Sequence, residues 1–446
     1  MVTRPRAALA VLLLLVLAGC GGGGSTSSSP SALPTTPVVS GPPKTAQTAI
    51  KHIVVIVQEN RSFDNLFQGF PGADTASSGL KSDGTTVALK PVSFAHGQDP
   101  NHNYADFVAS LDGGKLDGFD HVGSFPNNEP DISYSYLPRS EVQPYFDLAS
   151  AYALSDRMFQ SNNSASYPAH QYVIAAQSAN VVNVPSAIPW GCDAPAGTTV
   201  TMLRPDGTAF QSSQPPCFDY QTVGDSLDTA GVSWAYYSPQ IGAPGDLAGS
   251  LWTPFDAIRH IRFGADWSKS EIAPETSILS DIANGTLRNV SFVTPDALNS
   301  DHARFPSTSG PMWVSSIVNA IGGSRYWQDT AIFVTWDDWG GWYDHVVPPK
   351  VDQNGPGFRV PLIAISPYAK HGYVSHVQLE TSSITRYIEE VFQLPSLGQR
   401  DATANPPDDM FDYSQQVTPL SGIRASRSAM RAAATRPPSH LIPDED

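Results

Sequence analysis

Short apolar runs that end in polar side chains recur along this chain. The run Ile53–Val57 is continuous and β-branched, and the runs Asn289–Val293, Ala331–Val334 and Phe358–Ile365 are similar to it. Strands buried on both faces of a parallel sheet have such continuous runs, because neither face meets water. We therefore predict strands over these four segments and over Val232–Tyr237.

Helical patterns alternate with the apolar runs. We predict a polar turn over Ser161–His170 and helices over Glu141–Asp156, Gln171–Gln177, Gly310–Ile321 and Ser383–Phe392. Residues 73–140 are rich in Gly, Asp, Asn and Pro, which predicts long loops of the kind that often serve function. The alternation of strands and helices predicts an α/β fold with a mostly parallel sheet.

The N-terminal segment has the features of an export signal. Arg4 and Arg6 precede an apolar stretch, Ala8–Ala18, that is too short to span a bilayer comfortably as a mature helix. It ends in the sequence LAGC at positions 17–20, which resembles the lipobox of bacterial lipoproteins. The resemblance implies removal of residues 1–19 and lipid attachment at Cys20; the alternative is an ordinary signal peptide with an incidental cysteine. We expect an exported lipoprotein of the cell envelope, anchored in the membrane through Cys20.

Composition divides the rest of the chain. Residues 20–48 are rich in Gly, Ser, Thr and Pro and predict a flexible tether, followed by a folded domain over residues 49–425 and a mobile tail over residues 426–446. The net charge of −16 argues against a nucleic-acid partner. Export to an oxidising compartment predicts a disulfide between Cys192 and Cys217, with two buried thiols as the alternative.

Polar groups suited to a metal follow three of the predicted strands. Glu59 and Asn60 follow the first, Asp337 and Asp338 follow another, and His302 lies shortly after a third. A buried charge needs a partner or a metal, and carboxylate and amide oxygens favour Mg²⁺, Ca²⁺ or Mn²⁺. Taken singly, each residue could instead be a helix cap or a structural histidine. Together they predict a divalent-cation site at the sheet edge where open α/β sheets bind ligands.

Three motifs in this chain resemble those of the bacterial phosphoesterase family, which contains phosphatidylcholine-type phospholipases C and an acid phosphatase. Ile50–Phe67 is similar to the family's opening signature and Asp329–Pro349 to its second signature, while Ser164–His170 resembles the motif that presents its nucleophile. The resemblance implies an alkaline-phosphatase-like three-layer α/β/α sandwich with long loop insertions. It also implies one active-site divalent metal ion, which could be Mg, Ca, Mn or Zn.

The resemblance assigns metal ligands and a nucleophile. The implied ligands are Glu59, Asn60, Asp337 and Asp338, with Ser166 as both a further ligand and the nucleophile. A serine hydroxyl needs a base or a metal to act, so the cation would stabilise its alkoxide and bind a phosphoryl oxygen. A phosphoseryl intermediate would form, and water would then hydrolyse it. The family often has Gly-Pro shortly before the nucleophile where this chain has Ser164-Ala165, and Ser164 is a rival nucleophile.

The resemblance also assigns histidines. His302 would lie near the phosphoryl oxygens, and His102 would bind phosphate, with His96 as its rival. Either His302 or His102 could protonate the leaving oxygen, because imidazole carries a proton in the mildly acidic range. His345 matches a histidine of the second signature and would bind substrate, or would only orient a neighbouring carboxylate. A histidine that the family often has late in the chain is missing here, unless His376 replaces it.

The expected function is hydrolysis of phosphoric esters, as an acid phosphatase or broad phosphoesterase acting on small substrates. One alternative is a phospholipase C that hydrolyses phosphatidylcholine-like lipids. Another is a non-catalytic, lipid-anchored phosphate-binding protein, which would keep the metal and the histidines without needing Ser166.

Overall fold

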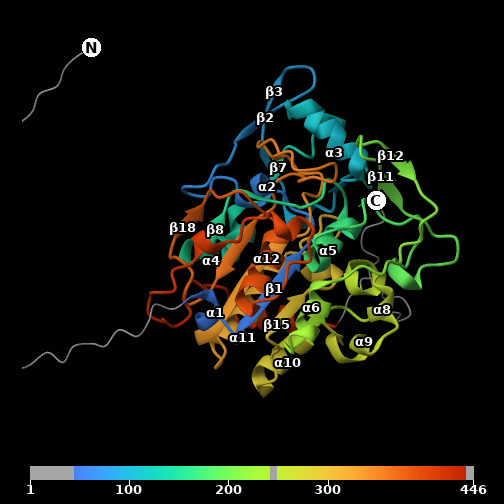
Figure 1. Ribbon diagram of the computed structural model, residues 1–446. Coiled ribbons are helices and arrows are strands. Elements are labelled where there is room, and N and C mark those ends of the chain that lie inside the picture. Colours follow the sequence, from blue (N-terminus) through green and yellow to red (C-terminus); the bar gives the residue numbers. More distant parts are fainter. Residues whose placement is uncertain (1–44, 242–248, 438–446) are drawn as a thin grey trace, which may run out of the picture. The chain divides into compact units, whose positions relative to one another are not determined.

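The computed structural model describes residues 45–241 and 249–437 (Figure 1). The predicted signal peptide, Cys20, all but the end of the predicted tether and the last nine residues lie outside the described residues. Among the helices of the described part, none has the length and apolar character needed to cross a membrane.

A mixed eight-stranded sheet forms the centre of the domain, in the order β14-β13-β15-β1-β16-β17-β8-β18. Five of its seven pairings are parallel, while β17 runs antiparallel to both of its neighbours. The strands are β14 (Glu271–Ile272), β13 (Trp234–Tyr237), β15 (Val290–Val293), β1 (His52–Gln58), β16 (Thr330–Trp336), β17 (Leu362–Ile365), β8 (Ala153–Ser155) and β18 (Tyr373–Ser375). All residues of β16, and all of β1 after His52, are buried, as continuous apolar runs predict.

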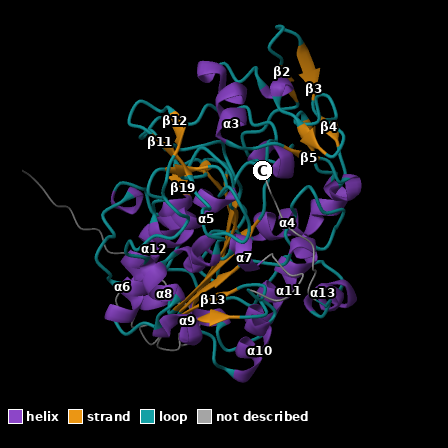
Figure 2. Cartoon of the chain, turned by 90° about the vertical axis from the view of Figure 1, so that its right-hand side faces the viewer, coloured by secondary structure: helices purple, strands orange, loops and turns teal. Residues whose placement is uncertain are grey.

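Helices cover both faces of this sheet, and Figure 2 shows α12, α5 and α6 on one side of the strands and α4, α11 and α13 on the other. The first layer comprises α1 (Ala46–Ala49), α5 (Ser166–Ala175), α6 (Val223–Thr229) and α12 (Thr381–Phe392). The second comprises α4 (Arg139–Ala151), α10 (Ser277–Asn284), α11 (Gly310–Gly322) and α13 (Arg427–Ala434). The predicted α/β/α sandwich with a mostly parallel sheet is confirmed.

Several element boundaries differ from the prediction, and three of the differences matter most. Helix α4 ends at Ala151, and Ala153–Ser155, predicted as its last turn, is strand β8. Strand β17 begins only at Leu362, directly after Pro361, which has no N–H to donate to a ladder. Helix α5 begins at Ser166, so the predicted polar turn over Ser161–His170 is wrong in its second half.

The loop region over residues 73–140 holds more regular structure than predicted. Helix α3 (Tyr104–Leu111) is capped by Asn103, whose side chain accepts hydrogen bonds from the N–H groups of Ala105 and Asp106. The short strands here are β2 (Ser78–Leu80), β3 (Thr86–Ala88), β4 (Lys90–Pro91), β5 (Asp99–Pro100), β6 (Ser124–Phe125) and β7 (Ser135–Tyr136). The region begins after helix α2 (Phe63–Phe67).

Smaller elements complete the described chain. They are β9 (Met158–Phe159), β10 (Val181–Val182), β11 (Thr201–Leu203), β12 (Ala209–Gln211), α7 (Gly249–Trp252), α8 (Arg259–Arg262), α9 (Ala265–Ser270) and β19 (Leu379–Glu380). A disulfide joins Cys192 to Cys217, with their Cα atoms 4.6 Å apart. In the segment expected to be a mobile tail, α13 buries Met430 and Ala433 and packs against α11.

Candidate active site

Two carboxylates meet at the carboxyl edge of the sheet. Glu59 directly follows β1 and Asp337 directly follows β16, and these strands are parallel neighbours with Gln58 opposite Trp336. The N–H of Asp337 donates to the carbonyl of Gln58 at 3.0 Å, which continues the ladder to the ligand position. Both acids are buried. Pairing of the strands therefore brings together two residues that are far apart in the sequence.

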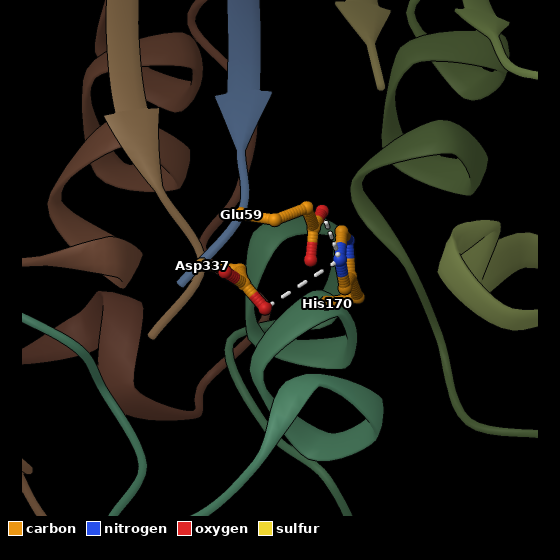
Figure 3. Close-up of side chains that lie close together, drawn as sticks. All are labelled: Glu59, His170 and Asp337. Carbon is orange, nitrogen blue, oxygen red and sulfur yellow. Dashed lines mark hydrogen bonds and ion pairs between the residues drawn. The ribbon is translucent and has the colours of Figure 1, made fainter. Parts of the chain in front are cut away.

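His170 of helix α5 completes this cluster (Figure 3). Its Nε2 lies 3.0 Å from Glu59 Oε1 and 3.7 Å from Asp337 Oδ2, and one ligand atom from each residue lies within 4.8 Å of the others. Burial lowers the pKa of His170 to about 4, although the charge of Asp337 opposes the shift. Near neutral pH the imidazole is thus uncharged, the form that binds metals, and it does not offset the negative charge of the acids.

Asn60 links the cluster to a histidine and to the predicted nucleophile. Its backbone has φ 58°, and its N–H donates to Asp337 Oδ1 at 3.0 Å. Its Nδ2 donates to His102 Nε2 at 2.8 Å and to Ser166 Oγ at 3.4 Å. Its Oδ1 is buried and has no hydrogen-bond partner among the described residues. That oxygen is consequently suited to bind a cation.

Ser166 is the first residue of helix α5. Its Oγ donates to Asp338 Oδ2 at 3.3 Å, and Asp338 Oδ1 accepts from the N–H of Gly340 at 2.8 Å. The first N–H groups of a helix lack intrahelical partners and favour negative charge, which suits a serine that must attack a phosphoryl group. Ser166 and His170 are four residues apart on this helix and therefore lie on one face.

The rival nucleophile Ser164 has a different environment. Its Oγ donates to Asn183 Oδ1 at 3.1 Å and accepts from the N–H of Asn183 at 2.7 Å. These two hydrogen bonds join the turn before α5 to the segment after β10. Ser164 accordingly supports the turn, while the hydroxyl of Ser166 points to the acids and Asn60.

Two of the predicted histidines lie beside this group. His102 donates from Nδ1 to the carbonyl of Pro100 at 3.0 Å, so its Nε2 is the acceptor for Asn60. The ring of His302 lies 6.3 Å from the ring of His102 and stacks on Trp252 at 5.8 Å. Its Nδ1 lies 3.3 Å from the backbone nitrogen of Arg304 and 3.7 Å from Asp99 Oδ2. Both histidines are buried.

The other three histidines considered from the sequence have different partners. His345 lies 2.5 Å from Asp64 and 3.0 Å from Asp74. Burial by itself would lower the pKa of His345, but Asp64 outweighs it and the pKa is raised. His96 pairs with Glu129 at the surface, and His376 pairs with Asp156. His345 thus contacts two neighbouring carboxylates, and both roles expected for it stay predictions.

The donor set fits a divalent cation. Two buried carboxylates and an uncharged imidazole converge, those of Glu59, Asp337 and His170. The buried side chains of Asn60 and Asp338 follow the two acids directly in the chain. Buried carboxylates without a compensating cation are costly, and oxygen ligands suit Mg²⁺ or Mn²⁺ while a histidine nitrogen also suits Zn²⁺. The expected divalent metal is therefore consistent with the residues present.

His170 is the site residue that sequence reasoning missed. A turn was predicted through this position, and a turn has no periodic face. A helix starting at Ser166 would have placed Ser166 and His170 on one face, because residues four apart are neighbours in a helix. Pro168, at the third position of α5, was the available signal, since proline is tolerated in the first turn of a helix.

Comparisons with known proteins identify the family of this chain. The chain matches the sequence profile described as "Phosphoesterase family" over residues 50–395. The non-hemolytic phospholipase C of Burkholderia pseudomallei is 24% identical over 414 residues, which cover 77% of this chain and 55% of that protein. Phospholipase C A of Mycobacterium tuberculosis (strain ATCC 25618 / H37Rv) is 25% identical over 452 residues, covering 87% of this chain and 82% of that protein.

A solved structure of a protein in the alkaline phosphatase superfamily from Vibrio parahaemolyticus is also similar. It has a TM-score of 0.40 and 12% identity, and the match covers 83% of this chain and 75% of that chain. The profile match spans most of the described residues and contains Glu59, Ser166, His302 and Asp337. The expectation drawn from the motifs is confirmed, and the chain belongs to the phosphoesterase family.

Proposed function

We propose that this protein hydrolyses phosphoric esters with a divalent metal and Ser166 as the nucleophile. Membership of the phosphoesterase family makes it a hydrolase that acts on phosphoester bonds. The observation that supports the finer proposal is the position of Ser166 at the start of α5. Its Oγ lies 3.3 Å from Asp338 and 3.4 Å from Asn60, and His170 lies one turn further along the helix.

A metal bound here would be held by Glu59, Asp337 and His170, with the Asn60 amide oxygen as a further donor, while Asp338 faces Ser166. When bound, it supplies Lewis-acid stabilisation of negative charge on the attacking and phosphoryl oxygens. The backbone N–H groups of Ser166 and Tyr167, the first two residues of α5, would stabilise the same charge, because the first N–H groups of a helix have no intrahelical partner. Negative charge on the reacting oxygens would thus be stabilised both by the bound metal and by the N-terminus of α5.

The side chains around Ser166 move the protons. Asp338 Oδ2 accepts the proton of Ser166 Oγ as the new Oγ–P bond forms. The bond from phosphorus to the leaving oxygen breaks, and His302, acting as an imidazolium beside Asp99, gives that oxygen a proton and becomes neutral. Water then attacks phosphorus and gives a proton to His302, while Asp338 returns its proton to Ser166 Oγ. The phosphoseryl bond breaks, which releases phosphate or a phosphomonoester and restores the Ser166 hydroxyl. His102, held by Pro100 and Asn60, fixes the amide of Asn60 that faces Ser166.

The nucleophile is tested by Ser166→Ala. We expect loss of turnover by at least about 1,000-fold on both a phosphomonoester and a phosphodiester, with the fold retained as judged by circular dichroism. Acid quenching of the wild-type enzyme during turnover should trap a phosphate on the peptide that contains Ser166, as seen by mass spectrometry. Full activity of Ser166→Ala, or a phosphate trapped on Ser164 instead, would refute the assignment.

The names of the relatives favour a phospholipid substrate within this class. The two described above are phospholipases C, and another, non-specific phospholipase C1 of Arabidopsis thaliana, is 24% identical over 419 residues. We therefore propose phosphatidylcholine-like lipids as a substrate class alongside small phosphoesters, and none of these names supports the preference for an acid phosphatase. Parallel assays on phosphatidylcholine and on an aryl phosphomonoester, at pH 5 and pH 7, separate the two.

A non-catalytic phosphate-binding role makes a different prediction. Such a protein would bind phosphate in the presence of metal equally well with or without the Ser166 hydroxyl, and would turn over neither substrate. The contact of Ser166 with Asp338 favours the enzyme, because a binding protein has no need of a base beside a hydroxyl.

We further propose that Cys20 carries a lipid that anchors the mature protein in the membrane of the cell envelope. The lipobox-like sequence supports this proposal. Cys20→Ser should release the protein from the membrane fraction and abolish labelling by a radioactive fatty acid. Retention of both properties would contradict the proposal. We expect no nucleic-acid partner, given the net charge of −16.

A further inference from the structure

Backbone contacts join the loop after β1 to the loop that carries His302. The N–H of Glu59 donates to the carbonyl of Ser300 at 2.8 Å. Arg61 donates to the carbonyl oxygen of Asp301 from both Nε, at 2.9 Å, and Nη2, at 2.6 Å. Two donors of one planar guanidinium thus hydrogen-bond to the peptide group that directly precedes His302.

The guanidinium of Arg61 is itself held in one place. Its Cζ lies 5.0 Å from the ring centroid of Phe94 and 5.0 Å from that of Trp342. Its third nitrogen, Nη1, donates to Asn65 Oδ1 at 3.4 Å, and the side chain is 2% exposed. Aromatic rings stack well on a guanidinium, so these two rings fix the plane in which Arg61 donates to the carbonyl of Asp301.

Asp301 has a backbone that needs such support. Its φ of 72° lies in the left-handed region, which residues other than glycine adopt less readily. Tyr145 donates to Asp301 Oδ2 at 2.6 Å, and Gln58 Nε2 donates to the same oxygen at 3.3 Å. These contacts hold the side chain of Asp301, and Arg61 holds its carbonyl. The backbone conformation of Asp301 in turn sets the direction in which the chain enters His302.

We propose that Arg61 is a positioning residue that holds His302 in line with the phosphoryl group through the backbone of Asp301. The inference rests on the proposed function, in which His302 protonates the leaving oxygen. A lysine at this position would keep the charge but could not make two parallel hydrogen bonds to one carbonyl in a fixed plane. Small misplacements of a catalytic group cost about 100-fold in rate.

The test is a double-mutant cycle between Arg61→Lys and His302→Ala. We expect Arg61→Lys to lower kcat by about 10- to 100-fold with little change in KM. In the His302→Ala background the same substitution should cause no further loss, because the group that it misplaces is gone. The metal concentration that half-restores activity after chelation should not change, since the metal ligands remain.

A matched control is Arg400→Lys. Arg400 is another buried arginine, which pairs with Asp352 at 3.0 Å and Glu380 at 2.7 Å. Any decrease in kcat that Arg400→Lys causes should be the same in the wild-type and His302→Ala backgrounds, so that the two fold-losses multiply in the double variant. If Arg61→Lys fails to fold, Trp342→Phe removes part of one stacking face and should give a smaller loss of kcat that is likewise absent without His302.

Two outcomes would overturn the proposal. Losses that multiply for Arg61→Lys and His302→Ala would show that Arg61 does not act through His302. A raised metal requirement in Arg61→Lys would assign its effect to the metal site. Full kcat of His302→Ala would instead contradict the proposed role of His302 as the acid. That result would refute the proposed function and not the role of Arg61 alone.

Discussion

His170 Nε2 lies 3.0 Å from Glu59 Oε1, although 111 residues separate the two side chains along the chain. Helix α5 brings His170 to the edge of the sheet where β1 ends, and Asp337 at the end of β16 faces the same nitrogen at 3.7 Å. One short helix therefore supplies both the proposed nucleophile and a nitrogen donor for the metal.

The first prediction concerns His170 as a ligand. Loss of even an outer partner of a metal ligand costs about 10- to 100-fold in metal affinity, so His170→Gln should weaken metal binding by at least about tenfold. Calorimetric titration of Mn²⁺ into chelator-treated protein measures this. His371→Gln is the control, because His371 is exposed and its Nδ1 contacts the carbonyl of Ala151. Equal affinities in wild type and His170→Gln would contradict the assignment.

Ser164→Ala should separate the two serines. The substitution removes both hydrogen bonds to Asn183, so we expect a loss of about 1–3 kcal/mol in the free energy of unfolding. Turnover at a temperature well below the melting point should stay within a few-fold of wild type, in contrast to Ser166→Ala. Urea unfolding and steady-state assays check the two parts, and a loss of turnover as large as that of Ser166→Ala would contradict this division of roles.

The disulfide should stabilise the segment between β10 and α6. Cys192 and Cys217 are 25 positions apart, and a crosslink over such a loop contributes roughly 3 kcal/mol by restricting the unfolded chain. Cys192→Ser with Cys217→Ser should lower the urea midpoint accordingly, and a reductant should lower the midpoint of the wild type but not of the double variant. An unchanged wild-type midpoint with reductant present would argue that the bond contributes nothing.

Asp301 should make stability fall between pH 4 and pH 6. Burial raises its pKa from 3.8 to about 6, against the opposing hydrogen bond from Tyr145 and charge of Arg61. The folded protein therefore keeps this proton up to about pH 6 while the unfolded chain releases it near pH 4, so the folded state is favoured below this window. The shift corresponds to roughly 3 kcal/mol, lost as the pH rises through the window.

Asp301→Asn removes this titration and should flatten the dependence over the same window, as measured by chemical unfolding at several pH values. Asp412→Asn is the control, because Asp412 is exposed and hydrogen bonds from Ser414 lower its pKa, which keeps its titration below the window. An equal slope in wild type and Asp301→Asn would show that another group is responsible.

Local patterns in the sequence were enough to predict the strands and most residues of the candidate metal site. The continuous apolar runs that became β1 and β16 could only be buried on both faces, and the acids that follow them had to lie at one edge once the strands were parallel. The motif around Ser166 predicted the position of the proposed nucleophile. These features are local, because each depends on a few neighbouring residues and on strand polarity.

Helix boundaries and the partners of histidines depended on packing. The sequence pattern predicted one helix over Glu141–Asp156, but α4 ends at Ala151 and the following residues form strand β8 of the sheet. His345 stands next to the second signature's acids in sequence, yet it contacts Asp64 and Asp74 from other segments. Sequence proximity says nothing about which side chains from distant elements fill the space around a residue.

By itself, the sequence determined the fold class, the family and the carboxylates at the ends of β1 and β16. Hydrophobic burial and strand direction can be inferred from short segments, without knowing how distant parts of the chain pack. Only the tertiary structure decided that His170 joins those carboxylates and that Arg61 grips the chain before His302. Both depend on where a helix or a loop from another part of the chain packs, and that position is set by the whole core.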